Sequence, residues 1–371
     1  MRIFIVRLCA FWLCVTRAFA EDAKPPVRYA VFGLTHDHAL GFLPHALKRT
    51  DVQLAGIIES NQVLCAKYAK RFNIPTNLFF ASLNDLLAHT NIQAVSTFTS
   101  TFEHRRVVEE CAAHHIDVMM EKPLAVSMEH ARAIAAAAKK SGIRVMVNYE
   151  TTWYPAVQRS YEILNDEKSI GELRRVVVHD GHRGPREIGC SEDFLGWLTD
   201  PVLDGGGALM DFGCYGADLL AWLNHGQRPT SVFAMTQHIK PNVYPKVEDD
   251  ATIVVTYPKS QGIIQASWNW PFGRKDMEVY GKTGYILSPQ SNIVRVHKPG
   301  GEETEEKLTA PATPTVNSDQ LTYLVAVVRH EIEPTGLSSL EINMIVTEIL
   351  TSARESAETG KRVDLSPNPT W

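Results

Sequence analysis

The 371-residue chain has no cluster of basic residues and no polybasic tail, although charged residues make up 21% of it. Its formal net charge is -5. Nucleic acids and anionic membrane surfaces are bound through concentrated Lys and Arg side chains, so neither is an expected partner. The hydrophobic content of 44% is typical of a globular protein with apolar material for two cores. We therefore predict two domains and a small-molecule partner.

Cysteines are few, and none of the six belongs to a CxxC pair. Neither a disulfide framework nor a metal site follows from their spacing. We expect four of them to be buried thiols: Cys65, Cys111, Cys190 and Cys214.

Long apolar runs are also missing, and the N-terminal one covers only residues 8–15. That run is too short for a membrane span, which needs about 20 residues. Basic Arg2 and Arg7 precede it, and Ala18-Phe19-Ala20 follows as a small-x-small cleavage site. Residues 1–20 are therefore predicted to be a signal peptide cleaved after Ala20, and the protein to be periplasmic or secreted without a membrane span. A short hydrophobic helix is the alternative. No Arg-Arg pair supports the twin-arginine route.

Strands and helices alternate between residues 26 and 148, which predicts a doubly wound parallel sheet of the Rossmann type. Strands are expected at residues 27–32, 53–58, 94–97 and 144–147, with another ending at Glu121. Helices are expected up to about residue 49 and at 63–72, 83–89, 102–114 and 130–140.

The turn after the first strand retains only Gly33 of a GxGxxG motif, with Thr35 and His38 in the other glycine places. A dinucleotide pyrophosphate would lie against this turn, where Thr35 offers a hydroxyl and an N–H. Glu59 ends the second strand and suits the ribose hydroxyls, which favours NAD over NADP. His36 is expected to contact the cofactor or to cap the helix. No metal is predicted, because adjacent residues of a tight turn do not easily aim at one ion.

Two further segments carry reactive side chains. Glu121-Lys122-Pro123 ends a buried strand, and ligands of open α/β sheets bind beyond the carboxyl ends of the strands. After three glycines, a second segment places polar and aromatic side chains on one stripe of a helix: Asp211, Tyr215, Asp218 and Trp222.

The remainder, residues 149–371, is predicted to be an α+β domain for substrate and subunit contacts, with an open and largely antiparallel mixed sheet. Strands are expected at residues 231–237, 251–257, 262–268 and 277–280, and another runs from residue 176 into a polar loop. Residues 302–307 form an expected charged loop, 310–314 a linker, and 318–330 and 339–359 helices that brace the domains. In the polar loop, His182 and Arg183 either contact sugar hydroxyls or a carboxylate, or face solvent. Trp268 and Trp270 either pack in the core or an interface or line the sugar site.

These motifs resemble the family of glucose–fructose oxidoreductase, inositol dehydrogenase and MocA proteins. The resemblance rests on residues 29–33, 94–104 with 121–125, 204–215 and 356–363. It implies an NAD(P)-dependent oxidoreductase in which Lys122 lies beside the nicotinamide and hydrogen-bonds the reacting hydroxyl. It also implies cofactor contacts for Thr99, His104 and Glu121, a substrate contact for Trp153, and a homodimer or homotetramer formed through the C-terminal sheet.

Many family members have histidine at the position of Tyr215, and this chain resembles the tyrosine variant. Tyr215 would accept the proton of a sugar or cyclitol hydroxyl, and Asp211 would orient Tyr215 or a second hydroxyl. The Lys122 ammonium is expected to lower the pKa of Tyr215 from its usual value near 10. Thr152 stands where family members often have arginine, so the substrate stays open.

Export and a nicotinamide cofactor together leave three functions open. The first is a dehydrogenase of a sugar, cyclitol or related polyol. The second keeps NAD tightly bound and regenerates it in each turnover, either between two sugars or in a glycosidase that works by oxidation, elimination and reduction. The third is a sugar-binding or regulatory protein that has lost the cofactor, which the missing glycines allow.

Overall fold

The computed structural model describes residues 24–309 and 315–366. The predicted signal peptide and the predicted linker at 310–314 lie outside this part of the chain. Within the described ranges, no helix has both the length and the apolar character that a membrane span requires.

The N-terminal half folds around a six-stranded sheet whose strands are all parallel, as the alternating pattern predicted. Its strands are β1 (Val27–Phe32), β2 (Val52–Ile58), β3 (Phe79–Phe80), β4 (Ala94–Thr97), β5 (Asp117–Glu121) and β6 (Val145–Asn148). The order β3-β2-β1-β4-β5-β6 changes direction between β1 and β4. Such a switch point opens a crevice at the carboxyl ends of the strands, where ligands bind.

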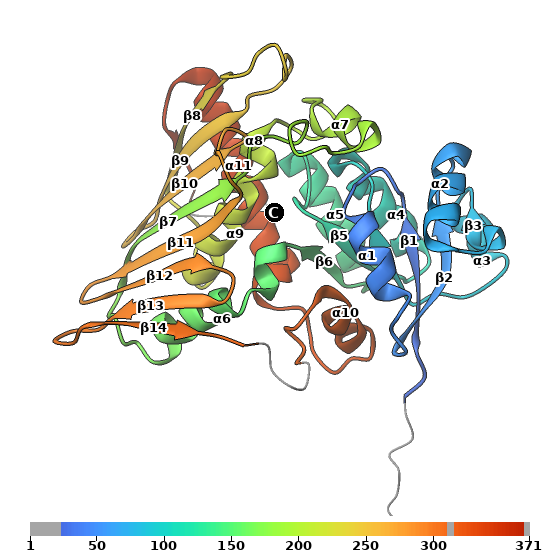
Figure 1. Ribbon diagram of the computed structural model, residues 1–371, viewed down its shortest axis with the longest axis horizontal. Coiled ribbons are helices and arrows are strands. Elements are labelled where there is room, and N and C mark those ends of the chain that lie inside the picture. The colour runs from blue at the N-terminus through green and yellow to red at the C-terminus, as the bar shows by residue number, and fades with distance from the viewer. Residues whose placement is uncertain (1–23, 310–314, 367–371) are drawn as a thin grey trace, which may run out of the picture.

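Five helices connect these strands (Figure 1). They are α1 (Ala39–Ala46), α2 (Gln62–Phe72), α3 (Leu83–Leu87), α4 (His104–Ala113) and α5 (Met128–Ser141). Side chains from the turns start several of them: Asn61 accepts the N–H groups of Val63 and Leu64 at α2, and Ser127 accepts that of His130 at α5. These bonds satisfy amides that a helix leaves free in its first turn.

The second half is built on a nine-stranded mixed sheet in the order β14-β13-β12-β11-β7-β10-β9-β8-β15. Its strands are β7 (Leu173–Gly181), β8 (Ser231–Gln237), β9 (Asp250–Thr256), β10 (Gln261–Ser267), β11 (Arg274–Gly281), β12 (Tyr285–Gln290), β13 (Ile293–His297), β14 (Glu303–Lys307) and β15 (Val363–Asp364). Only β7 and β10 pair in parallel, and the other pairs are antiparallel.

The prediction of a charged loop at residues 302–307 is wrong, because Glu303–Lys307 is the edge strand β14. Charged side chains are common on edge strands, where they oppose pairing with other chains. Such a strand does not show the apolar alternation by which β8, β9 and β10 were predicted. Strands β12, β13 and β15 were not predicted either.

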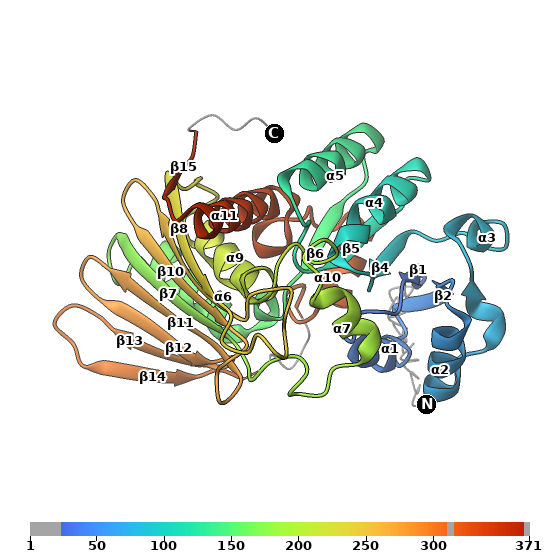
Figure 2. The ribbon, with the colours of Figure 1, turned by 90° about the horizontal axis from the view of Figure 1, so that it is seen from above.

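Helices cover the face of this sheet that looks toward the N-terminal half (Figure 2). They include α9 (Gly213–Leu223) and α11 (Leu340–Thr359), which pack together and against β10 and β8, respectively. Side chains alternate between buried and half-buried along β9 and β10, so the far face of the sheet is open. Homo-oligomer formation through that face stays a prediction. Helix α10 (Gln320–Val328) returns to the N-terminal half and shares a core cluster with β1.

The predicted stripe of Asp211, Tyr215, Asp218 and Trp222 is interrupted. Helix α8 (Ala208–Asp211) ends at Asp211, and α9 begins only at Gly213. Asp218 is completely buried, without a hydrogen-bond partner among the described residues, and burial raises its pKa well above its usual value. Trp222 stacks on Tyr161 at 4.2 Å. Asp211 and Tyr215 are therefore the two members of the stripe that reach the cavity described next.

Candidate active site

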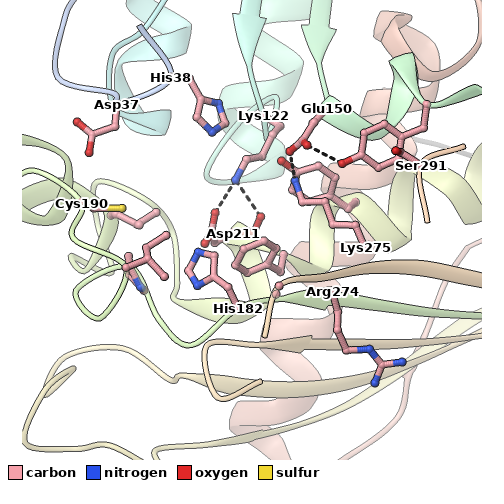
Figure 3. Close-up of a pocket in the computed structure, with 18 of the residues that line it drawn as sticks. Asp37, His38, Lys122, Glu150, His182, Cys190, Asp211, Arg274, Lys275 and Ser291 are labelled. Atoms are coloured by element: carbon pink, nitrogen blue, oxygen red, sulfur yellow. Dashed lines mark hydrogen bonds and ion pairs between the residues drawn. The ribbon is translucent and has the colours of Figure 1, made fainter. Parts of the chain in front are cut away.

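A cavity of about 540 Å³ lies between the carboxyl ends of β5 and β6 and the mixed sheet (Figure 3). Lys122, which directly follows β5, projects into it from the first half of the molecule. Asp211, Tyr215 and His182 line it from the second half. The fold thus brings together side chains that the sequence placed in three separate motifs.

Lys122 and Asp211 form a buried ion pair in this cavity. The Lys122 ammonium donates to Asp211 Oδ1 at 2.5 Å and to the Asp211 carbonyl at 3.0 Å. Both side chains are only 6% exposed. Burial favours the neutral forms, but mutual attraction outweighs it, raising the pKa of Lys122 and lowering that of Asp211. Both groups are therefore charged at neutral pH.

Gly207, which directly precedes α8, allows the close backbone packing that places Asp211 in the cavity. A Cβ atom on Gly207 would lie 2.0 Å from the Glu248 carbonyl oxygen, so another residue would not fit there. The Glu248 carboxylate accepts the N–H of Gly207 at 2.8 Å and that of Leu209 at 3.1 Å. On the far side, Trp268 is buried and donates its indole N–H to Asp211 Oδ2 at 2.9 Å. The carboxylate is thereby fixed in one orientation.

Tyr215 is 1% exposed and carries an ammonium group near its ring from each half of the molecule. Nζ of Lys122 lies 5.2 Å from the ring centroid, and Nζ of Lys275 lies 4.3 Å from it. The expected lowering of the Tyr215 pKa is nevertheless wrong for this structure. Burial raises that pKa well above 10, with further contributions from acidic neighbours that include Glu150 and Asp211. Tyr215 is therefore a neutral phenol here, because burial favours its uncharged form and the nearby Lys122 ammonium is paired with Asp211.

The sequence missed a second group of ionisable side chains in the cavity. Glu150, from the 3-10 turn η3 (Glu150–Trp153), pairs with Lys275 of β11 and accepts the Tyr154 hydroxyl at 2.5 Å. Figure 3 shows Glu150 and Lys275 on the side of the cavity away from Asp37 and Cys190, with Lys122 between the two sides. Residues 150 and 275 meet only through the tertiary fold, so no local pattern signals the pair.

His182 and Arg183 are separated by the structure. His182 lines the cavity, and its Nδ1 accepts the amide N–H of Gly184 at 2.9 Å. The neutral ring therefore carries its proton on Nε2, and burial lowers the pKa of His182. Arg183 is not part of the cavity wall, and its carbonyl accepts the ammonium of Lys240.

Glu121 is buried beside the cavity and links it to the turn that follows β1. It accepts His38 Nδ1 at 2.9 Å and the amide of Asn148 at 2.9 Å. Trp153 does not line the cavity, but donates its indole N–H to Asn148 at 2.8 Å. Trp153 is therefore connected to Glu121 through Asn148.

His36, His38 and Glu121 come closer together than the sequence argument against a metal assumed. Their potential ligand atoms lie within 4.8 Å of one another. His36 Nδ1, however, accepts the N–H of His38 at 3.1 Å, and both oxygens of Glu121 are already hydrogen-bonded. A metal ion bound through Nδ1 of either histidine would replace these hydrogen bonds.

A second cavity, of about 470 Å³, lies at the carboxyl ends of β1 and β2. Four of the residues predicted to bind the cofactor line it: Gly33, Thr35, Glu59 and Thr99. Gly33 has φ +81°, and a Cβ atom there would lie 2.5 Å from Thr99 Cγ2, so only glycine fits. Glu59 accepts the N–H of Leu34 at 3.0 Å and that of Asn61 at 2.8 Å, which fixes its carboxylate at the groove. These residues suit the adenosine half of a dinucleotide.

Two histidines predicted to touch the cofactor lie in neither cavity wall. His104 is buried and hydrogen-bonds the carbonyl of Pro123 at 3.1 Å, so it supports the turn that carries Lys122. His36 is 1% exposed and packs against Phe194 and Trp197 of α7 (Glu192–Leu198).

A parallel sheet with a groove at its switch point, next to a Lys–Asp–Tyr cavity on a second sheet, is the arrangement expected of a two-domain, nicotinamide-dependent oxidoreductase. The family models agree. Residues 27–149 match the oxidoreductase family with an NAD-binding Rossmann fold, and residues 157–287 match the GFO/IDH/MocA C-terminal domain. The chain therefore belongs to the GFO/IDH/MocA family of oxidoreductases, and its N-terminal half has the family's NAD-binding Rossmann fold.

Sequence relatives include trans-1,2-dihydrobenzene-1,2-diol dehydrogenases. That of Sus scrofa is 24% identical over 222 residues, which are 60% of this chain and 61% of the relative. That of Xenopus tropicalis is 26% identical over 191 residues, or 51% of this chain and 53% of the relative. The chain thus covers less than two thirds of the length of these two enzymes.

Solved structures show the same fold. An inositol dehydrogenase homolog from Azotobacter vinelandii, complexed with NAD+, has a TM-score of 0.79 at 18% identity, covering 92% of this chain and 98% of that one. The aldose-aldose oxidoreductase from Caulobacter crescentus, complexed with glycerol, has a TM-score of 0.77 at 22% identity, covering 92% of this chain and all of that one.

Proposed function

We propose that this protein oxidises a hydroxyl group of a sugar, a cyclitol or a related polyol. The observation that carries this proposal is the buried Lys122–Asp211 pair beside Tyr215, in a cavity next to the cofactor groove. Two pairs of oppositely charged side chains lie in the cavity wall, Lys122 with Asp211 and Lys275 with Glu150. Such pairs can both donate to and accept from hydroxyl groups, which suits a neutral, multiply hydroxylated substrate.

Each residue has a distinct role in this reaction. Gly33, Thr35, Glu59 and Thr99 hold the dinucleotide, which when bound accepts a hydride from the carbon that carries the hydroxyl. The Lys122 ammonium donates a hydrogen bond to the substrate oxygen, while Asp211 keeps Lys122 charged and oriented. Tyr215 accepts the hydroxyl proton as its phenolate, which forms when the neutral phenol first gives up its own proton to water in the cavity; the positive charges of Lys122 and Lys275 near its ring favour that form.

Two substitutions test these roles. Lys122→Ala and Tyr215→Phe should each abolish NAD reduction, followed at 340 nm with D-glucose, D-xylose, myo-inositol, glycerol and a trans-dihydrodiol as substrates. Lys282→Ala, at an exposed lysine after β11, is the matched control and should keep wild-type rates. Full activity in either site variant would refute the proposed chemistry.

One observation supports a second candidate, redox-neutral glycoside cleavage with retained NAD. Alcohol oxidation needs one proton acceptor, whereas the Glu150–Tyr154–Lys275 group supplies a further acid–base set in the same cavity. In this reaction a sugar hydroxyl is oxidised, the aglycone leaves with a proton, water adds, and the ketone is reduced at the same carbon. The net change is hydrolysis. Release of p-nitrophenol from nitrophenyl glycosides without added NAD would support it, and strict dependence on added NAD would exclude it.

Export and assembly stay part of the proposal. A periplasmic or secreted protein would have its N-terminus at Glu21, which N-terminal sequencing of protein from the expressing cells can test. Assembly through the open face of the mixed sheet predicts a dimer or tetramer by light scattering, and a monomer after charged residues replace Ile263 and Val254 on that face. The third candidate, a binding protein without cofactor, predicts that purified protein binds neither NAD nor NADP.

A further inference from the structure

Helix α7 belongs to the second half of the chain but is fastened to the turn after β1. The Asp37 carboxylate accepts the backbone N–H of Ser191 at 2.7 Å and the Ser191 hydroxyl at 2.6 Å. Ser191 in turn caps α7 by accepting the N–H of Phe194 at 3.2 Å. The Asp37 carboxylate therefore hydrogen-bonds both the backbone and the side chain of Ser191, the residue that caps the helix.

Other contacts between α7 and the first half are weaker or apolar. The Trp197 indole N–H points to the Thr35 carbonyl at 3.4 Å, and the His36 ring lies 4.6 Å from that of Phe194. At the far edge, Lys67 of α2 pairs with Asp193 at 3.5 Å, with both side chains about 40% exposed. Exposed ion pairs of this kind contribute little. The two bonds to Asp37 are the strong polar connection, because hydrogen bonds to a charged group are about twice as strong as neutral ones.

Helix α7 contributes side chains to both cavities, so the bonds that hold it affect both. Phe194 and Leu198 line the cavity of Lys122, whereas Asp193, Gly196 and Trp197 line the cavity of Glu59. The helix thus lies where the two cavities adjoin, over the turn that a dinucleotide pyrophosphate approaches in this fold. In Figure 1, α7 lies above α1, on the side of the turn that joins β1 to α1.

We propose that the Asp37–Ser191 bonds are a clasp that closes α7 over bound NAD, so that the cofactor leaves only when the clasp opens. The clasp rests on the proposed function, since it presumes NAD in the groove. If the cofactor is released slowly, NADH formed in one step must be oxidised back to NAD while it is still bound. The substrate cavity must then also take an oxidised partner, either a carbonyl acceptor or the keto intermediate of the first substrate.

The release rate of NADH tests the clasp without any substrate. Wild-type protein, loaded with NADH, is mixed with excess NAD, and the loss of bound-NADH fluorescence is followed. Asp37→Asn, which weakens both bonds, should release NADH on the order of 10-fold faster or more. Ser191→Ala keeps the backbone N–H and should give a smaller acceleration. In the double variant the effects should not add, since they act on the same two bonds.

Glu192→Gln is the control, because it removes a carboxylate from α7 that is 82% exposed and contacts only Arg186 among the described residues. Its release rate should equal that of the wild type. Equal rates for wild type, Ser191→Ala and Asp37→Asn would overturn the clasp while leaving the proposed function intact. Failure of wild type and Glu192→Gln to bind NADH at all would instead overturn the proposed function.

Discussion

Replacing Lys122 by methionine removes the cation of the buried Lys122–Asp211 ion pair. The resulting loss in the free energy of unfolding can be estimated from the structure. Nζ lies 2.5 Å from Asp211 Oδ1, and both side chains are 6% exposed. At an effective dielectric constant of about 20, the attraction between two unit charges at this separation is about 7 kcal/mol. Removal of the buried ammonium group also removes its desolvation cost. The variant should therefore lose about 3 to 5 kcal/mol of its free energy of unfolding, which is typical when one partner of a buried ion pair is removed.

The loss of unfolding free energy in Lys122→Met should depend on pH, because the variant leaves the buried Asp211 carboxylate without its cation. In the wild type the pKa of Asp211 is lowered, so the carboxylate stabilises the fold above its unfolded pKa of about 3.9, and this contribution fades as the pH falls. Without Lys122, the two largest contributions that oppose burial are gone, and only the smaller ones of His182 and Trp268 remain, so burial raises that pKa. Asp211 then destabilises the fold at neutral pH, and the penalty shrinks as the pH falls toward 4.

Urea unfolding followed by tryptophan fluorescence at pH 7 and at pH 4.5 measures both effects. Lys246→Met, which breaks a surface pair with Asp200 whose lysine is 65% exposed, is the control and should cost less than about 1 kcal/mol. The double variant Lys122→Met/Asp211→Leu should recover a large part of the loss, since it leaves no buried charge. A loss for Lys122→Met that matches Lys246→Met, or that is independent of pH, would refute the reasoning.

Three further predictions concern the groove and a thiol. Gly33→Val should weaken NAD binding by at least about 10-fold in a fluorescence titration, because its Cβ would clash with Thr99 at φ +81°; unchanged affinity would contradict this placement. Glu59→Gln should reduce the preference for NAD over NADP in the same titration, since the carboxylate that repels a 2′-phosphate is gone. Cys190 should react slowly with Ellman's reagent at pH 8 and faster as the pH rises, because burial raises its pKa to about 12.

Buried strands were the part of the fold that the sequence predicted best. Strands β1, β4 and β8 begin and end at the predicted residues. Such strands read as continuous hydrophobic segments or clean alternation, so their limits are visible locally. Strand β14 was missed because its side chains are charged, and two-residue β3 because it is too short to show a pattern.

For the site, motifs pointed to three residues that the fold brings into one cavity, but not to the side chains that they contact. Lys122, Asp211 and Tyr215 were found because they lie in compact segments beside glycine or proline. The pairing of Lys275 with Glu150 and the clasp between Asp37 and Ser191 join residues more than 120 positions apart, so only the packed fold reveals them. Burial likewise decided the direction of the Tyr215 pKa, which depends on how far solvent is excluded and not on spacing.

The most direct test of the account is to ask whether this protein carries NAD. The chain from Glu21 onward would be purified, denatured and analysed by mass spectrometry for released dinucleotide, and empty protein would be titrated with NAD and NADP. The account predicts one binding site per chain with NAD preferred, and, if the clasp closes as proposed, NAD already present after purification. Protein that carries no dinucleotide and binds neither NAD nor NADP would contradict it.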